Sequence, residues 1–575
     1  MVKNLFQLFS VAKINRAGRF LILAGSLVWS LTMVKSGLVY NYGMGFWGPN
    51  GHDGVWHIAL AQSLANGSWR MPIFSGEVIR NYHIGFDLFL AILHKLTFIP
   101  ITTLYFQILP PIFGILIGYF AYHFTLRWTK SDLKAWWATF FVYFAGGWGW
   151  IITLFRNGEI GGESIFWSQQ SISTLVNPPF ALSLLLIFLG LSFLVKGLKT
   201  KDRRLLIIAT FLFGILVQIK VYAGILALTG LSISGFLYLF QRKGITLIKV
   251  FAGALIISIL IFSPVSNGVG TTLLFKPFWF LEEMVSSPDR LYWPRMASAI
   301  ANYKLAGNWV KLIPAYGLLF MIFWFGNLGT RVIKEPNIFS WLKNWKNLSW
   351  VEVFTATLIV TGAIIPIFFV QSGTAWNTIQ FIYYSLVFSG ILAGVTFAEF
   401  IQKSKLNASV IYIIEATIIV LTVPTTFGTL MHYLPLRPPA MISNYELEAL
   451  EFLSKQTDGI VLTQPYNRER AILAQPNPPR PLYLYESTAY VSAFSGKRTY
   501  LEDEVNLEIT GYDWRERRNE VEPFFGDNCK IDVNFFTDKE VSYIYLVKQN
   551  LCKREFETIA DKIFENLEVV VFKVN

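Results

Sequence analysis

The sequence predicts a polytopic α-helical membrane protein with about eleven transmembrane helices and a small α/β domain at its C-terminal end. Of its 575 residues, 53% are hydrophobic and 15% are charged, whereas a soluble domain carries about 25% charged residues. Many apolar runs approach the roughly 20 residues that cross a bilayer at a rise of about 1.5 Å per residue. These runs end before residue 434. We therefore expect a membrane domain at 1–433 and a soluble domain at 434–575.

The predicted spans begin with residues 20–34, whose basic flank of Arg16 and Arg19 places the N-terminus in the cytoplasm. A long polar and aromatic outer loop, residues 40–103, follows. It contains an apolar helix at 84–97 that is too short to cross and is expected to lie in the membrane interface. The remaining spans are residues 104–126, 135–155, 179–194, 205–218, 221–239, 248–262, 310–325, 351–370, 379–397 and 410–425.

Lysine and arginine fall in alternate loops, as the positive-inside rule requires of cytoplasmic loops. With an odd number of spans, the C-terminal domain lies outside the plasma membrane. This distribution accounts for the net charge of +12, so we expect a membrane partner and no nucleic acid. The loops are marked by Arg127, Lys130, Lys134, Lys196, Lys199, Lys201, Arg203, Arg204, Arg242, Lys243, Arg331, Lys334, Lys343, Lys346, Lys403 and Lys405.

The C-terminal domain shows helix and strand signals of a small α/β fold. Ser443 and Glu446 form a capping box that opens a predicted helix through residue 453. Cys529 and Cys552 are the only cysteines; they form a disulfide in an oxidising compartment and are two free thiols otherwise, and both readings stay open here. The predicted strands are residues 459–463, 541–547 and 567–574, and a predicted helix at 556–564 separates the last two.

Three of the six histidines, His52, His57 and His83, lie near two aspartates in the first outer loop. Asp53 and His57 are four residues apart in Gly51-His-Asp-Gly-Val-Trp-His57, and so are His83 and Asp87. Residues four apart share one face of a helix, so each pair presents a carboxylate and an imidazole together.

Such pairs at the membrane edge have two chemical uses. Asp53, partly desolvated, can act as a general base, or it can hold a divalent cation. Two Asp/His pairs brought together suit Zn²⁺ or Mn²⁺, whereas Mg²⁺ prefers carboxylates alone. The sequence thus predicts Asp53 as the catalytic residue and Asp53, His57, His83 and Asp87 as candidate metal ligands. The alternative is that these side chains cap and anchor interfacial helices.

Other outer segments supply further candidates for substrate binding. Lys220, where two spans meet, can bind a phosphate or extend to the lipid headgroups. Glu282 and Arg290 lie in a long aromatic loop, and the alternative for both is solvated charge. Glu163, in a glycine-rich segment, is expected to belong to a solvated loop. Trp376 can stack on a sugar or anchor its helix at the interface. The polar side chains beside Trp376 that can bind sugar hydroxyls are Asn377, Gln380 and Tyr384.

Three segments and the order of the spans together resemble one protein family. The segments are Gly51-His-Asp-Gly-Val-Trp-His57, Asn81-Tyr-His-Ile-Gly-Phe-Asp-Leu-Phe-Leu90 and Ala489-Tyr-Val-Ser-Ala-Phe-Ser-Gly-Lys-Arg498. One span, a large outer loop with an acidic residue, many further spans and an outer C-terminal domain complete the pattern. This layout resembles the GT-C superfamily of integral-membrane glycosyltransferases. Asp53 stands alone where the family commonly has Asp-x-Asp or Asp-Glu.

The resemblance implies an enzyme that passes a sugar from a polyprenyl-phosphate donor to a glycan, lipid or protein acceptor at the outer face. Asp53 would be the catalytic base or the acid that organises a divalent metal (Mg, Mn or Zn). Lys220 or Arg290 would neutralise the departing phosphate, and a single displacement would invert the anomeric centre. Two other functions stay open. A flippase or exporter of a lipid-linked glycan would need more ionisable groups within its spans, and a non-catalytic scaffold would bind a partner through its tail.

Overall fold

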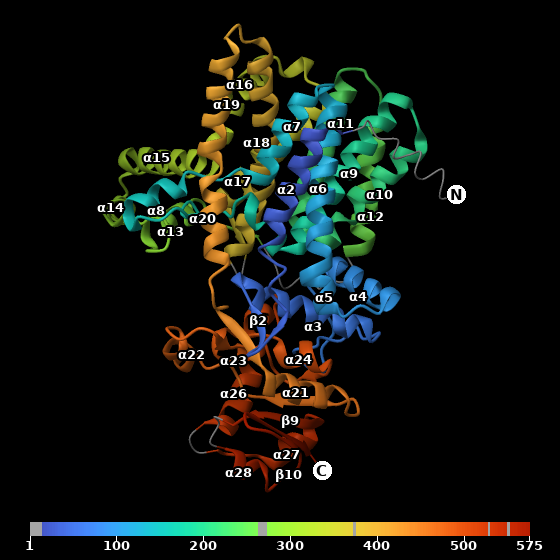
Figure 1. Ribbon diagram of the computed structural model, residues 1–575, viewed down its shortest axis with the longest axis vertical. Coiled ribbons are helices and arrows are strands. Elements are labelled where there is room, and N and C mark those ends of the chain that lie inside the picture. Colours follow the sequence, from blue (N-terminus) through green and yellow to red (C-terminus); the bar gives the residue numbers. More distant parts are fainter. Residues whose placement is uncertain (1–13, 263–272, 372–374, 527–528, 549–551, 575) are drawn as a thin grey trace.

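A bundle of long helices is joined at one end to a mixed α/β region in the computed structural model of the protein (Figure 1). The structure describes residues 14–262, 273–371, 375–526, 529–548 and 552–574. The chain after residue 440 supplies most of the α/β region, which lies at the lower end of Figure 1. One apolar core extends from the bundle through the first outer loop into the C-terminal sheet and includes Trp29, Leu60 and Ile544.

The bundle consists of apolar helices, and by their length and composition the chain is a polytopic α-helical membrane protein. Three predicted spans correspond to shorter helices, α2 (Arg16–Ser30), α10 (Arg203–Ile219) and α12 (Thr246–Phe262), of 15, 17 and 17 residues. The number eleven therefore stays a prediction. In the described chain, seven segments are long and apolar enough to cross a membrane: Ile101–Thr129 (α5, Ile101–Thr103, to α6, Leu109–Thr129), Pro178–Thr200 (α9), Val221–Phe240 (α11), Trp309–Lys343 (α15, Trp309–Leu328, to α16, Glu335–Lys343), Trp350–Phe368 (α17), Ala375–Lys403 (α18) and Ala408–Tyr433 (α19, Ala408–Thr422, to α20, Pro424–Tyr433).

The predicted span 135–155 is broken. It forms α7 (Asp132–Phe144) and α8 (Gly149–Asn157), which meet at an angle of 42°. The break contains Gly146, where an added Cβ would lie 2.4 Å from the Cβ of Thr425. Only a residue without a side chain allows this close approach, so the break is set by packing against α20 as well as by the loss of helical hydrogen bonds.

The helix at the predicted span 310–325 has an unexpected direction. This helix, α15, runs across Figure 1, whereas the bundle helices follow the long axis of the molecule. It packs against α13 (Trp279–Ser286) and α14 (Pro294–Leu305). Gly329 ends α15 at a φ of +56°, a backbone conformation that glycine adopts without strain. The sequence predicts the helix here, and tertiary packing decides its direction.

The first outer loop is folded onto the C-terminal residues. Strand β2 pairs antiparallel with β5, with Gly43 opposite Ser443 and Phe46 opposite Ala440. The four-stranded sheet has the order β1-β2-β5-β7. The predicted short helix 84–97 is present as α4. The elements of this region are β1 (Val39–Tyr40), β2 (Gly43–Phe46), α3 (Asp53–Ala65), α4 (Gly85–Thr97), β5 (Ala440–Ser443) and β7 (Arg480–Pro481).

The C-terminal region is built on a five-stranded sheet of order β10-β11-β9-β6-β8. The capping box of Ser443 and Glu446 is present at the start of α21. The predicted helix 556–564 is wrong, because most of it forms β10, paired antiparallel with β11. Apolar residues at 556, 559 and 563 follow helical spacing, yet the segment completes a sheet edge. The elements are β6 (Ile460–Thr463), β8 (Arg498–Thr499), β9 (Val541–Val547), β10 (Ala560–Glu565), β11 (Val569–Val574), α21 (Asn444–Ser454), α22 (Arg468–Ala474), α23 (Leu482–Tyr485), α24 (Tyr490–Ser495), α25 (Glu504–Thr510), α26 (Trp514–Phe525), α27 (Val533–Asp538) and α28 (Lys553–Phe556).

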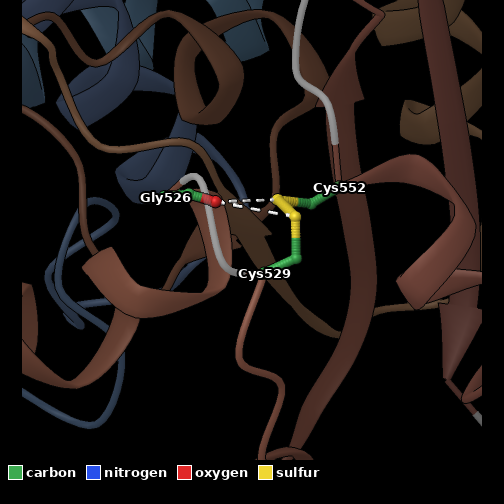
Figure 2. The surroundings of a disulfide bond; sticks show 3 residues. All are labelled: Gly526, Cys529 and Cys552. Atoms are coloured by element: carbon green, nitrogen blue, oxygen red, sulfur yellow. Dashed lines mark hydrogen bonds between the residues drawn. A yellow bond between two sulfur atoms is a disulfide. The ribbon is translucent and has the colours of Figure 1, made fainter.

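Cys529 and Cys552 form a disulfide, with their Cα atoms 5.3 Å apart. The two sulfur atoms lie 3.5 and 3.2 Å from the carbonyl oxygen of Gly526 (Figure 2). A disulfide sulfur carries no hydrogen, so these are close contacts. Of the two readings that the sequence leaves open, the structure has the bridge, which joins the segment after α26 to the start of α28.

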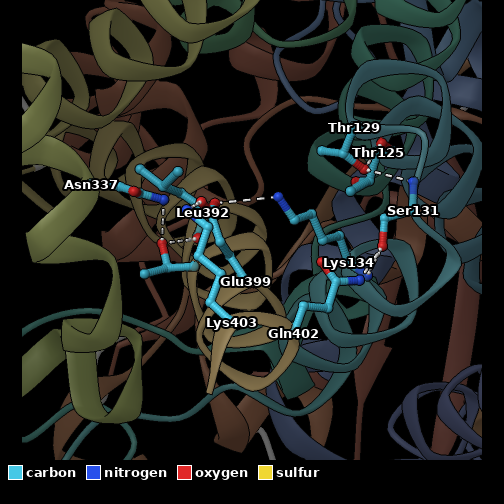
Figure 3. Close-up of polar contacts among 10 residues, drawn as sticks. Thr125, Thr129, Ser131, Lys134, Asn337, Leu392, Glu399, Gln402 and Lys403 are labelled. Atoms are coloured by element: carbon cyan, nitrogen blue, oxygen red, sulfur yellow. Dashed lines mark hydrogen bonds and ion pairs between the residues drawn. The ribbon is translucent and has the colours of Figure 1, made fainter. Parts of the chain in front are cut away.

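A polar cluster at the other end of the bundle ties the turn between α6 and α7 to α18. Lys134 and Lys403 both pair with Glu399, at 3.2 and 2.5 Å. The side-chain amide of Gln402 donates to the hydroxyl oxygen of Ser131 at 2.9 Å (Figure 3). Lys134, one of the basic residues that mark predicted cytoplasmic loops, therefore joins α7 to α18, whereas Lys403 pairs within α18.

Candidate active site

Asp53 is the first residue of α3, and its side chain is 52% exposed. Its Oδ1 lies 2.9 Å from Nδ1 of His52, and Nε2 of His52 lies 3.4 Å from Oδ1 of Asp503. The positive end of the helix dipole also favours a carboxylate at this position. His52 therefore links the predicted catalytic carboxylate to the C-terminal region.

The groups around Asp53 keep its carboxylate ionised. Burial acts to raise the pKa of Asp53. The hydrogen bond from His52 and the charges of His52, His57 and Lys220 outweigh that effect, so the pKa lies below its usual value. Burial acts to lower the pKa of His52, but Asp503 and Asp53 raise it well above its usual value. At neutral pH the pair is a carboxylate bound to an imidazolium.

His57 and Asp87 form a buried pair between α3 and α4. Nδ1 of His57 lies 2.7 Å from Oδ1 of Asp87. Within the described chain, Oδ2 of Asp87 has no hydrogen-bond partner, and burial raises the pKa of Asp87 against the opposing effect of His57. The ring of Tyr105 stacks on His57 at 5.8 Å. Both side chains are buried, so the pair joins α3 to α4 inside the protein.

Lys220 lies between α10 and α11 and is 5% exposed. Its Nζ lies 3.4 Å from Oδ1 of Asn177. Burial lowers the pKa of Lys220 to about 8, although Asp53 and Asp87 act to raise it. The side chain is therefore buried near the outer-loop carboxylates and does not extend to the headgroups, and it is mostly charged at neutral pH.

A groove of about 690 Å³ separates the segment before α4 from α11 and α18. His83, Tyr222, Gln371 and Asn377 are among its lining residues, and the hydroxyl of Tyr222 donates to Oε1 of Gln371 at 2.8 Å. Nδ1 of His83 is without a partner among the residues that the structure describes. Burial and the charge of Lys220 lower the pKa of His83 well below its usual value. The groove thus offers a neutral imidazole and several amide and hydroxyl groups.

Arg290 and Trp376 form one stacked unit at the edge of a larger hollow of about 1900 Å³. The guanidinium of Arg290 lies 4.8 Å from the ring of Trp167 and 4.5 Å from the ring of Trp376. Nη1 of Arg290 donates to the hydroxyl oxygen of Ser164 at 2.9 Å. Arg290, predicted to bind a phosphate, therefore contacts Trp376, predicted to stack on a sugar.

Three further predicted substrate ligands are bound to other side chains of the protein. Tyr384 is fully buried, and its hydroxyl lies 2.7 Å from that of Ser183 inside the bundle. This placement corrects the expectation for Tyr384, because its only polar atom is used in helix packing. Gln380 donates to Oδ1 of Asn377 on the same helix, α18, at 3.1 Å. Glu282 on α13 pairs with Lys304 at 2.5 Å.

Among the four predicted metal ligands, His57 pairs with Asp87, whereas Asp53 pairs with His52 and His83 lines the groove beside α11 and α18. In the part of the chain that the structure describes, no three His, Cys, Asp or Glu side chains are placed to hold one ion. Of the four residues, Asp53 is the one exposed enough to take a ligand from solvent, and a carboxylate accepts Mg²⁺, Mn²⁺ or Zn²⁺. Metal binding stays a prediction.

Sequence reasoning missed the settings of three charged residues. Glu163 is half-buried in the wall of the larger hollow: it accepts from the backbone N–H of Gln170 at 2.7 Å and from Ser173 at 2.9 Å, and burial raises its pKa to about 7. Arg331, expected in a cytoplasmic loop, is 1% exposed and binds the side chain of Gln170. Its place directly after an apolar run was the available signal. The sequence contains no comparable signal for Asp503, because its contact with the first outer loop joins distant parts of the chain.

The chain resembles solved glycosyltransferase structures. The oligosaccharyltransferase of Archaeoglobus fulgidus, tethered with an acceptor peptide containing the NVT sequon, matches with a TM-score of 0.52 and 11% identity over 92% of this chain and 69% of that chain. Its apo form matches with a TM-score of 0.50 and 12% identity over the same shares. The chain has a GT-C fold. The resemblance inferred from the sequence is thereby confirmed at the level of fold.

A third structure extends over nearly the full length of both chains. ArnT of Cupriavidus metallidurans bound to undecaprenyl phosphate aligns over 96% of this chain and 97% of that chain, with a TM-score of 0.45 and 10% identity. No protein-family model matches the sequence. No curated protein matches it either.

Proposed function

We propose that the protein is a membrane glycosyltransferase that moves a sugar from a polyprenyl-phosphate donor to an acceptor at the outer face. The observation that carries the proposal is the setting of Asp53. It is a half-exposed, ionised carboxylate at a helix N-terminus, fixed by His52 and close enough to the buried Lys220 for the two to shift each other's pKa. The GT-C fold supports the same function.

The reaction is a displacement at the anomeric carbon of a hexose or pentose. The oxygen of the acceptor hydroxyl attacks this carbon and gives its proton to Asp53. The bond from the anomeric carbon to the carrier phosphate breaks, and its electron pair leaves with the phosphate oxygen. Lys220 or Arg290 neutralises the charge that develops there. One displacement inverts the anomeric centre.

The proposed membrane arrangement follows the sequence prediction. Residues 1–433 form the transmembrane domain with eleven spans, a cytoplasmic N-terminus and the outer loop 40–103, and residues 434–575 lie outside the plasma membrane. The disulfide between Cys529 and Cys552 supports the outer placement, since such bonds persist in oxidising compartments. The partners are a lipid-linked sugar donor and a glycan, lipid or protein acceptor. A divalent metal held by Asp53 would supply positive charge to the phosphate.

The substitution Asp53→Asn tests the proposal in proteoliposomes that contain radiolabelled polyprenyl-phosphate hexoses and pentoses and a cell-envelope extract as acceptor. We expect normal membrane insertion and a transfer rate lower by at least about 10²-fold, since the variant cannot accept the proton. Asp458→Asn, whose side chain is 79% exposed on the C-terminal surface, should keep the wild-type rate. Undiminished transfer by Asp53→Asn excludes the proposed role. Label that crosses the bilayer on its carrier without transfer points to a flippase instead.

A further inference from the structure

The larger hollow, beside Trp376, has the room and the mixed wall of a ligand site. Water can enter about 880 Å³ of it, which is within the usual size of a ligand pocket, about 300–1,000 Å³. Three of its lining residues have large apolar side chains that are well exposed: Ile160 (39%), Trp376 (43%) and Met431 (71%). Exposed apolar side chains in the wall of an otherwise polar hollow suit a ligand that has both an apolar and a polar part.

An apolar stripe on the segment from α19 to α20 ends at this hollow. Ile413, Val420, Phe427 and Met431 follow one another at intervals of seven, seven and four residues, so they lie on one face of the helical segment. Each of these side chains is more than half exposed, and the segment is the least buried of the candidate membrane spans in the described chain. In Figure 1, α19 and α20 form a column at the flank of the bundle, and α8 lies beside α20. In a membrane span such a stripe faces lipid, so it connects the bilayer to the hollow.

The polar part of the wall favours a headgroup without negative charge. Glu159 and Asp289 place exposed carboxylates in this wall, and Asp289 also pairs with Arg290 at 3.2 Å. Arg156 is the one arginine among the described lining residues, and its guanidinium donates to the carbonyl oxygens of Arg290, at 2.8 Å, and Leu291. Hydroxyl groups can donate to the carboxylates, whereas the same charges oppose a phosphate or a carboxylate on the ligand.

The hollow borders the turn that leads into α3. The ring of Tyr433, a lining residue, packs on the turn Gly48–Gly51, where a Cβ added to Gly48 would lie 3.3 Å from it. This turn comes directly before His52 and Asp53. In addition, Tyr383 lies within electrostatic range of both Glu163, in the wall of the hollow, and Asp53. A headgroup in the hollow is therefore near the proposed catalytic carboxylate.

We infer that the acceptor of the proposed reaction is a membrane lipid with an uncharged, hydroxyl-bearing headgroup, such as a glycolipid, and that it enters through this hollow. The inference rests on the proposed function and narrows its acceptor from a glycan, lipid or protein to a lipid. The tail lies along the stripe on α19 and α20, and the headgroup occupies the hollow. In the described chain the groove that contains His83 shares no lining residue with the hollow, so the donor has an opening of its own.

Photolabelling of the full chain in nanodiscs tests this inference without any donor. The probe is a monoglucosyl diacylglycerol with a diazirine beside its headgroup, and mass spectrometry locates the labelled peptides. We expect label on residues 157–164 and 428–433, which supply most of the lining residues. Unlabelled monoglucosyl diacylglycerol should suppress this label. Glucosylglycerol, the soluble headgroup, should not suppress it, because it lacks the apolar tail that binds the stripe.

The charge of the headgroup is tested by a second competitor. Glucuronosyl diacylglycerol has the same tails and a carboxylate on its sugar. It should compete about tenfold less well than the monoglucosyl lipid, because the carboxylates of the wall repel it.

A substitution that fills the hollow tests the place of binding. A Cβ added to Gly161, a lining residue, meets nothing within 4 Å, so Gly161→Trp puts an indole into the hollow without a clash at its base. We expect labelling at least about tenfold lower, because the headgroup and the indole compete for the same space. Gly317→Trp is the matched control: a Cβ there also meets nothing within 4 Å, and the residue lies on α15 outside the hollow. This variant should be labelled as the wild type is.

Three results would overturn the lipid acceptor: label spread over the bundle without enrichment at the hollow, equal suppression by glucosylglycerol, or equal labelling of Gly161→Trp and Gly317→Trp. Equal competition by the glucuronosyl lipid would overturn the class of headgroup. Failure of the proposed function looks different. Label at the hollow, with no transfer of radiolabelled sugar to the monoglucosyl lipid or to the extract, leaves a lipid-binding hollow without an enzyme. Transfer to a soluble acceptor with no label at the hollow keeps the enzyme and removes its lipid acceptor.

Discussion

At the scale of single residues, His52 is shared by two acids that come from distant parts of the sequence. It contacts the exposed Asp53 on one side and Asp503, which is 1% exposed, on the other. Asp503 is further bound by the backbone and side-chain amides of Asn506, at 3.1 and 2.8 Å. A buried carboxylate needs such partners, because an unpaired charge in a low-dielectric interior is costly. The result is a fixed imidazolium that holds Asp53 in one orientation.

Lys220 leads to a prediction about pH. Its pKa of about 8 means that the ammonium is charged below pH 8 and loses its charge as the pH rises through this value. If the charge neutralises the leaving phosphate, the transfer rate should fall above about pH 8. Lys220→Arg keeps its charge to much higher pH and should move this fall upward. Rates measured from about pH 6 to about pH 10 check the prediction.

The control for this profile is Lys455→Arg, at the exposed C-terminal end of α21, which should follow the wild-type curve. Superimposable alkaline limbs for wild type and Lys220→Arg would show that another group limits the rate at high pH.

At the scale of elements, the pairing of β2 with β5 depends on Gly43. Its φ is +124°, and an added Cβ would lie 2.1 Å from the carbonyl oxygen of Ile442. We expect Gly43→Ala to destabilise the protein by about 1–3 kcal/mol, through backbone strain and loss of the close pairing. A lower thermal midpoint and faster proteolysis of the C-terminal region would report this. Gly317→Ala on α15, where an added Cβ meets nothing within 4 Å, should leave both unchanged. Equal behaviour of the two variants would contradict the role of Gly43.

The elements also show how far the sequence alone reaches. Long apolar runs and capping boxes predict local structure, which is why α9, α18 and the start of α21 are found where expected. The helix predicted at 556–564 is wrong because helical spacing of a few apolar residues is also compatible with an edge strand. Pairing with β11 makes most of this segment a strand. The apolar run at 310–325 predicts the helix α15, but its direction is set by packing against α13 and α14 and cannot be read from the run itself.

At the scale of the whole molecule, the disulfide allows a test of the proposed topology. In intact cells, a membrane-impermeant maleimide should label Cys529 and Cys552 only after treatment with an impermeant reductant. A cysteine introduced at the exposed Lys405, in a predicted cytoplasmic loop, should react only after the membrane is permeabilised. Mass spectrometry of the labelled peptides distinguishes these sites. Labelling of the native cysteines that requires permeabilisation would place the C-terminal region in the cytoplasm.

The whole molecule also explains why the candidate site was only partly predictable. Asp53, His57, His83 and Asp87 are close in sequence and share a loop, so a motif search finds them. Other contacts around the candidate site could not be found in this way. These contacts join segments that meet only in the folded chain. They are the contact of His52 with Asp503, the hydrogen bond from Arg331 to Gln170, and the hydrogen bond from Tyr433 to Glu163.

The pairing of β2 with β5 has a consequence for the synthesis of the protein. During synthesis, the ribosome releases every membrane helix before it releases the strand that completes the sheet, and Asp503 emerges later still. Until then, the outer loop has neither its partner strand nor the acid that fixes His52. A chain that stopped before residue 440 would contain every candidate membrane span and still lack the residues that position Asp53, so the proposed transfer reaction would require the finished molecule.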